Sequence, residues 1–138
     1  MAAEYQKPLP APDEDTRAFW DACRAHELRA QRCAACGAFR WPPQGICPHC
    51  YSWEFAWTPL EPTGTIDSYV VVHHDTGAFA VDIPYVVVNV TIDGTNGHVR
   101  LMSNLVGPAW EDVRVGMRVR AFFDDLSPAI TLPKFRPL

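Results

Sequence analysis

The sequence predicts a mainly β protein with one helix near its N-terminus, organised as a small zinc ribbon followed by a five-stranded OB-fold barrel. Four cysteines form two Cys-x2-Cys pairs separated by ten residues. Hydrophobic residues recur at helical spacing before these cysteines and in alternation after them. A chain of 138 residues can hold one ordinary core, or a smaller core plus a metal-stabilised module. The second arrangement fits this pattern better.

Two segments precede the cysteines. Residues 1–12 contain three prolines and little that can be buried, so we predict a flexible arm. Residues 13–31 are predicted to be a helix, because Asp13 offers an N-cap and apolar side chains follow at helical spacing: Phe19, Ala22, Cys23 and Ala30, with Trp20 at the edge of the stripe. This stripe packs either on the chain's own domain or on a partner. Cys23 is interpreted as a small core or interface residue.

Residues 32–58 are predicted to be the zinc ribbon, with the four thiolates of Cys33, Cys36, Cys47 and Cys50 as ligands. A site closed by four thiolates has no open position for water or substrate, so its one metal ion is structural. The segment is rich in glycine and proline and has no sustained periodicity, so the metal supplies the free energy that orders it. Two disulfides, or iron bound by the same ligands, are the alternatives.

Residues 59–138 are predicted to be the barrel. The clearest strand is 85–93, where valine and isoleucine alternate with mostly polar side chains, and a glycine-rich turn joins it to a second strand at 98–106. Further strands are expected at 64–74, 117–123 and 130–135, with a short helical turn at 108–113. Five short strands with a helical insertion after the third describe an OB-fold, which protects strand edges by closing.

Composition limits the possible partners. The net charge is −4, so no overall positive field attracts phosphate backbones, and nucleic acid is an unlikely partner class by this criterion. No apolar run is long enough to cross a membrane, and the first residues do not resemble a signal peptide. We therefore expect a cytoplasmic protein that does not enter a membrane. A reducing compartment also tolerates the odd cysteine, Cys23.

Two regions carry candidate partner-binding residues. Six large aromatic residues crowd the ribbon, more than a module of this size can bury: Phe39, Trp41, Tyr51, Trp53, Phe55 and Trp57. They face another protein or close the seam between ribbon and barrel. The loop 73–83 is long for a turn and carries Phe79, so we expect it to point toward a partner's active site. The predicted partner-binding residues are Phe19, Trp20, Trp41, Trp53 and Phe79.

The sequence predicts no catalytic residue. His73 and His74 stand beside Asp75, but neighbouring residues on a strand point to opposite faces and do not converge on one proton. No serine or cysteine nucleophile has a base nearby in sequence, and no glycine-rich phosphate loop is present. A role in interface or loop structure is the simpler interpretation of these histidines.

Over about residues 15–138 the chain resembles the family of proteins in which a rubredoxin-like zinc ribbon precedes an OB-fold and which associate with acyl-CoA enzymes. The motifs that carry the resemblance are distributed along the chain: Phe19-Trp20, residues 27–33, Cys36-Gly37, Trp41-Pro42-Pro43, Cys47-Pro48-His49-Cys50, Gly64-Thr65-Ile66, residues 84–87, residues 101–105, Gly116-Met117 and residues 132–137. One departure is His26, where the family usually has glycine before Glu-Leu.

The resemblance implies an accessory role. Members of the family pair with thiolase-like enzymes, including aldolases of steroid side-chain degradation, and others associate with hydratases of the hot-dog class. The chemistry then lies on the larger partner, and the family's helices can help to form an acyl-CoA channel. The resemblance thus implies a non-catalytic subunit of a thiolase-like aldolase or another acyl-CoA enzyme, with possible contact to acyl-CoA.

Two other functions remain open from the residues alone. Zinc ribbons and OB-folds commonly bind single-stranded nucleic acid, and Arg114, Arg118 and Arg120 form a possible basic strip. An iron centre in the four cysteines would make the chain an electron carrier.

Overall fold

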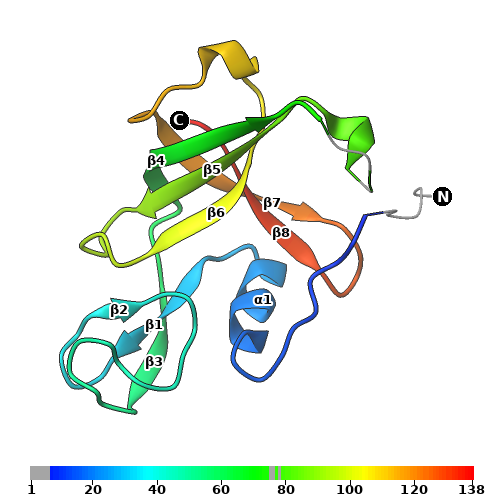
Figure 1. Ribbon diagram of the computed structural model, residues 1–138. Helices are drawn as coiled ribbons and strands as arrows, with labels where there is room; N and C mark the ends of the chain where they lie inside the picture. The colour runs from blue at the N-terminus through cyan, green and yellow to red at the C-terminus, as the bar shows by residue number, and fades with distance from the viewer. Residues whose placement is uncertain (1–6, 75–76, 78) are drawn as a thin grey trace.

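The computed structural model describes residues 7–74, 77 and 79–138, and Figure 1 shows a small sheet, a helix and a barrel. The ribbon and helix comprise α1 (Arg17–Arg24), β1 (Arg29–Cys33), β2 (Phe39–Arg40) and β3 (Phe55–Pro59). The barrel comprises β4 (Thr63–Val72), β5 (Tyr85–Ile92), β6 (Arg100–Leu105), β7 (Arg118–Asp125) and β8 (Thr131–Pro137), with short 3-10 helices η1 (Ala80–Asp82) and η2 (Trp110–Asp112).

The helix is shorter than the predicted range 13–31. Asp13 does hold the turn that leads into it, since the Thr16 N–H donates to Asp13 Oδ1 at 2.9 Å, but α1 itself spans only Arg17–Arg24. His26 ends the helical segment with a φ of 59°, a left-handed conformation in which a right-handed helix does not continue. This backbone explains why glycine suits the same position in similar sequences. Arg29–Cys33 instead forms β1, so the C-terminal part of the predicted helix belongs to the ribbon sheet.

The ribbon sheet has the order β2-β1-β3, with both pairs antiparallel. Its central strand β1 ends at Cys33, opposite Phe55 of β3. The long connection between β2 and β3 contains no strand and carries the second cysteine pair. Its conformation therefore depends on side-chain contacts and on the metal rather than on a ladder of backbone hydrogen bonds.

The barrel closes in the order β4-β5-β6-β8-β7, with β7 paired to β4. All pairs are antiparallel except β6 with β8, where Leu105 lies opposite Phe135. This connectivity confirms the predicted five-stranded OB-fold, and the strands lie within a few residues of the predicted ranges. The expected inward face of β5 is buried: Val86, Val88, Val90 and Ile92.

The close approach of β4 and β5 requires glycine at position 64. A Cβ atom there would lie 2.4 Å from the carbonyl oxygen of Thr91 and 2.6 Å from Cγ1 of Val90. A bulge follows in β4 between Ile66 and Ser68, which shifts the alternation of its side chains.

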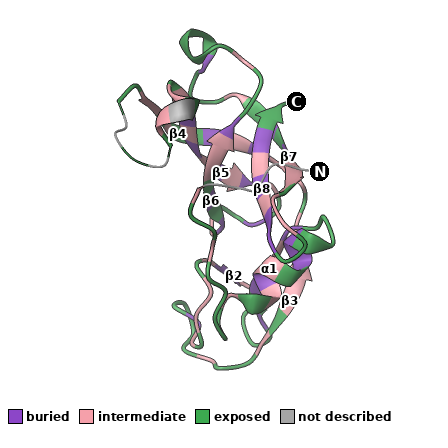
Figure 2. Ribbon diagram, turned by 90° about the vertical axis from the view of Figure 1, so that its right-hand side faces the viewer, coloured by how far each residue is buried: buried purple, intermediate pink, exposed green. Residues whose placement is uncertain are grey.

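Helix, ribbon and barrel share one core. Phe19 of α1, Leu28 and Phe39 belong to the same buried apolar cluster as Val88 and Phe135 of the barrel, and α1 contacts β1, β7 and β8. Figure 2 shows buried residues along α1 and the barrel strands, whereas the ribbon loops are mainly exposed. Within the described ranges, no helix has the length and apolar character needed to span a bilayer.

Candidate metal centre and docking surface

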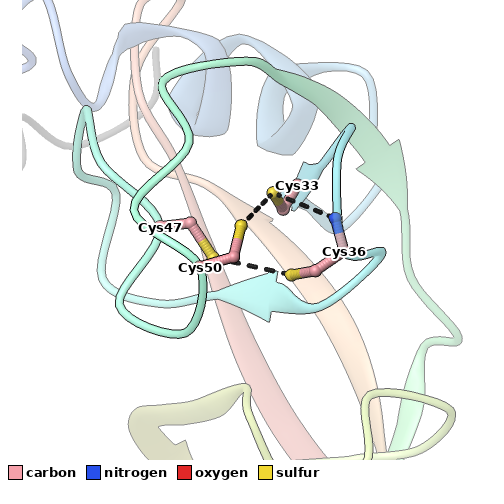
Figure 3. A group of neighbouring side chains, drawn as sticks. All are labelled: Cys33, Cys36, Cys47 and Cys50. Carbon is pink, nitrogen blue, oxygen red and sulfur yellow. Dashed lines mark hydrogen bonds between the residues drawn. The ribbon is translucent and has the colours of Figure 1, made fainter.

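The four predicted ligands converge at one end of the ribbon sheet. Figure 3 shows the side chains of Cys33, Cys36, Cys47 and Cys50 pointing toward one another from the two knuckles, and their sulfur atoms all lie within 4.8 Å of one another. The sulfurs of Cys33 and Cys50 are 3.5 Å apart, and those of Cys36 and Cys47 are 3.7 Å apart. These separations exceed a disulfide bond of about 2.05 Å and match the roughly 3.8 Å between sulfurs of a tetrahedral zinc site with Zn–S bonds of about 2.3 Å.

The surroundings of the four thiols shift their pKa values in different directions. A hydrogen bond from the Cys36 N–H lowers the pKa of Cys33 to about 6, which favours the thiolate. The Ser52 N–H favours a thiolate at Cys50, but crowding by the other sulfurs raises the pKa of Cys50 to about 12. Four thiolates this close together need a positive ion. The donor set therefore holds one zinc ion in a structural role, with no open position for catalysis.

The two knuckles have matching backbone conformations. The residue after each second cysteine has a positive φ, 78° at Gly37 and 63° at Tyr51. Each of these residues donates its N–H to the first cysteine's carbonyl, at 3.0 Å for Gly37 and 2.9 Å for Tyr51. Glycine adopts this conformation at little cost, whereas tyrosine does not. Tyr51 is nevertheless 72% exposed, so its own packing does not explain why it occupies a strained position.

Two buried polar side chains hold the loop between β2 and β3. The Gln44 N–H donates to Gln31 Oε1 at 2.8 Å, and Arg40 Nη1 donates to the Gln44 carbonyl at 3.1 Å. The Arg40 guanidinium is buried and lies 4.9 Å from the ring centroid of Phe55. The sequence does not single out either residue, because Gln31 falls within the predicted helix and arginine is usually exposed. These hydrogen bonds from β1 and β2 hold the loop that carries the second cysteine pair.

The predicted partner-binding residues lie in different environments. Phe19 is 5% exposed and packs against Trp20 and Trp41, with ring centroids 5.0 and 4.8 Å away. The ring of Phe19 is therefore covered by the protein's own core, and little of it is exposed for docking. Trp20 and Trp41 are half-buried against the same core. Trp53 is 72% exposed and Phe79 is 36% exposed.

The aromatic residues of the ribbon divide between the two predicted roles. Phe39, Trp41 and Trp57 pack into or against the shared core and close the seam. Tyr51 and Trp53, each 72% exposed, face outward beside Cys50. The Trp53 ring lies over Gly45, where a Cβ atom would come within 3.2 Å of it. One face of the indole is thus supported by the ribbon.

A histidine pair joins the second knuckle to the barrel. The ring of His49 stacks on that of His98, with centroids 4.5 Å apart. His98 belongs to the turn region between β5 and β6, so this contact fixes the metal-bearing loop relative to the barrel. Nothing in the sequence indicated that these residues meet.

Two further side chains with potentially reactive groups, those of His73 and Cys23, make packing contacts away from the metal site. The His73 ring meets the edge of Trp110 at a centroid distance of 4.9 Å, which fits a packing role, and Asp75 lies outside the described residues. Burial raises the pKa of Cys23 to about 12, so its thiol is not an activated nucleophile. Among the described histidine, cysteine and acidic residues, only the four ribbon cysteines gather as a set of three or more that could hold a metal ion.

A four-cysteine ribbon joined to an OB barrel defines a class of small zinc-ribbon and OB-fold proteins. The profile of the rubredoxin-like zinc ribbon domain of ChsH2 matches residues 20–55, and that of the ChsH2 C-terminal OB-fold domain matches residues 57–124. The chain belongs to this ChsH2 family of zinc ribbon plus OB-fold proteins.

Two similar proteins are named as hydratase alpha subunits, and one similar solved chain is titled as an aldolase. A probable enoyl-CoA hydratase alpha subunit of Thermomonospora curvata is 39% identical over 95% of this chain and 40% of its own length. The 3-oxo-4,17-pregnadiene-20-carboxyl-CoA hydratase alpha subunit of Mycobacterium tuberculosis is 34% identical over 84% of this chain and 36% of its own length. The chain thus spans about two fifths of these curated relatives. A solved chain titled Ltp2-ChsH2(DUF35) aldolase is 38% identical with a TM-score of 0.83, covering 93% of this chain and 98% of that one.

Proposed function

We propose that this chain is a non-catalytic accessory subunit that binds and stabilises a larger acyl-CoA enzyme. The observation that carries the proposal is the exposed pair Tyr51 and Trp53 beside the closed zinc site, each with 72% of its surface accessible. Large aromatic side chains on a rigid support are typical anchors of protein interfaces. The zinc and the His49–His98 contact supply that rigidity.

A thiolase-like aldolase of steroid or other bulky acyl-CoA degradation is the partner we favour. The supporting observation is that the chain of the Ltp2-ChsH2(DUF35) aldolase is matched over 98% of its length, at 38% identity. The hydratase alpha subunits are matched over only 40% and 36% of theirs, although the name of one includes a steroid-type carboxyl-CoA substrate. A hot-dog-type enoyl-CoA hydratase is the second candidate partner.

The surface of the barrel disfavours single-stranded nucleic acid. OB-folds bind single strands with stacking aromatics and basic side chains on the face of their second and third strands, here β5 and β6. Met102 of β6 is 69% exposed and Val70 of the neighbouring strand β4 is 59% exposed, and neither side chain stacks on a base or pairs with a phosphate. Arg118 of the possible basic strip is engaged by Asp93, with Nη1 2.8 Å from Oδ1.

Purification of the tagged chain from its native cell, followed by mass spectrometry of the eluate, tests the proposal. We expect enrichment of a thiolase-like chain, and the Trp53→Ala variant should lose it, because truncating a central aromatic anchor costs about 2 kcal/mol or more, roughly 30-fold in affinity. Val115→Ala removes another exposed apolar side chain and serves as the matched control. Enrichment of a hydratase chain would select the second candidate.

Two results would contradict the accessory role. One is a chain that elutes alone as a monomer under all conditions. The other is tight binding to single-stranded DNA or RNA with a steep salt dependence, which marks the release of counterions from a phosphate backbone.

A further inference from the structure

A groove with a volume of about 860 Å³ lies on the barrel, away from the zinc site. Its walls come from the loop before β5, the start of β5, the end of β6 and η2, and include the rings of Phe79, Tyr85 and Trp110. The volume is within the range of ligand-binding pockets, about 300–1,000 Å³. The β5–β6 surface and the β4–β5 loop are also where OB-folds bind their ligands.

The N-terminal arm of the same chain lies along this groove. Lys7, Pro8, Leu9 and Pro10 form part of its lining. The Lys7 ammonium makes an ion pair with Asp82 of η1 and lies 5.8 Å from the ring centroid of Phe79. Figure 1 shows the arm, in blue, rising from α1 toward η1, in green. The arm thus reaches the η1 side of the barrel, and its Lys7 contacts Asp82 and Phe79 there.

The arm has the chemistry of a peptide ligand for such a groove. Proline restricts the backbone to extended conformations and removes N–H donors, so Pro8, Pro10 and Pro12 keep the segment extended without a paired strand. Aromatic-lined grooves bind such segments because little conformational entropy is lost. The groove adds Pro84 and Pro108 to its three rings. Its other lysine, Lys134, is paired with Asp124 at 2.7 Å, so the groove is not an anion site.

We propose that this groove is a binding site for an extended, proline-rich peptide that carries a lysine, and that the chain's own residues 7–10 occupy part of it in cis. Asp82 selects the lysine, and Phe79, Tyr85 and Trp110 contact the proline-containing stretch. The arm is exchangeable, because it leaves about 860 Å³ of the groove open and Leu9 remains 44% exposed. A tethered segment competes at millimolar effective concentration. This inference goes beyond the accessory function and does not depend on which enzyme is the partner.

The probe is a synthetic peptide with the sequence of residues 7–12, Lys-Pro-Leu-Pro-Ala-Pro, labelled at its C-terminus. Its binding to the full chain is measured by fluorescence anisotropy. The Lys7→Glu variant places two acidic groups together and releases the arm. If the arm occupies nine tenths of the wild-type grooves, Lys7→Glu should bind the peptide about tenfold more tightly than the wild type. Adding Trp110→Ala or Asp82→Asn to Lys7→Glu should abolish that gain.

Asp112→Lys in the Lys7→Glu background is the matched control, because it reverses an exposed charge on η2 outside the groove lining. It should leave peptide affinity unchanged. Zinc content and the thermal midpoint confirm that each variant folds.

Three outcomes would overturn the proposal: equal peptide affinity in wild type and Lys7→Glu, no detectable binding to Lys7→Glu, or full binding after Trp110→Ala is added. Light scattering gives a further check. A wild-type dimer that dissociates on Lys7→Glu would show that the arm docks on a second copy, which refutes occupancy in cis.

Discussion

The substitution Asp93→Asn tests how the barrel is closed. Asp93 follows β5 and accepts hydrogen bonds from Arg118 of β7 and from Thr63 of β4, so it links three strands at the β4–β7 seam. These contacts, led by the one from Arg118, lower the pKa of Asp93 from 3.8 to about 2. A carboxylate that is easier to ionise in the folded state stabilises that state wherever it is charged.

The size of the effect follows from this shift and from exposure. The lowering of the Asp93 pKa from 3.8 to about 2 corresponds to about 2.4 kcal/mol without screening. The Arg118 and Asp93 side chains are 47% and 34% exposed, and solvent screening reduces the contribution to about 1 kcal/mol. The stabilisation is complete above pH 3.8 and is lost as the pH falls through about 2. Asp93→Asn should therefore lower the thermal midpoint by about 2–4 °C at pH 7.

Urea unfolding of the wild type and of Asp93→Asn, at pH 7 and pH 3 with a chelator present throughout, measures this contribution. The chelator makes metal release equal in all samples. The difference in unfolding free energy should shrink by about half at pH 3, since the pH then lies between the two pKa values. Asp67→Asn removes an exposed carboxylate from β4 and serves as the control. A difference that is absent at pH 7, or that is the same at both pH values, would refute the reasoning.

Three further predictions concern the metal, a close contact and a strained residue. The Cys47→Ser variant should lose the zinc ion and the hydrogen-exchange protection of residues 41–54, while the barrel strands stay protected. The reason is that metal binding supplies about 10–16 kcal/mol for folding such modules. Zinc retained by the variant on metal analysis would contradict this prediction. Gly64→Ala should lower the unfolding free energy by about 1–3 kcal/mol, since its Cβ would lie 2.4 Å from the Thr91 oxygen; an unchanged urea midpoint would oppose it. The Tyr51→Gly variant should stabilise the isolated chain by about 1 kcal/mol, because glycine adopts the positive φ without strain. It should also weaken the complex, because the exposed ring is removed. Unchanged complex formation would exclude Tyr51 as an anchor.

The barrel was largely predictable because its signal is local. In β5, alternating side chains are buried and half-buried as their order in the sequence indicates. The helix was less predictable, because the residues after Arg24 also fit a helical stripe. Ala30 is buried, as that stripe suggests, but it is buried in β1 opposite Thr58 of β3. Pairing with a distant strand decided its conformation, and intrinsic propensity did not.

Of the candidate sites, the metal site was predictable from local sequence, whereas the docking surface was not. The cysteine spacing predicted the metal ligands, because each Cys-x2-Cys pair lies on one tight turn and needs no distant contact to be recognised. The docking residues depend on exposure, which is a property of the whole fold. Phe19 and Trp53 are both large aromatic residues of the predicted docking set, yet one is 5% and the other 72% exposed.

The sequence by itself determined the zinc ligands, the order of ribbon and barrel, and the inward face of β5, since all three depend on short-range spacing. Only the tertiary structure decided which aromatic residues reach the surface, how His49 meets His98, and that the N-terminal arm lines the barrel groove. These features bring together residues far apart in the chain. Such contacts form only when the shared core places helix, ribbon and barrel side by side.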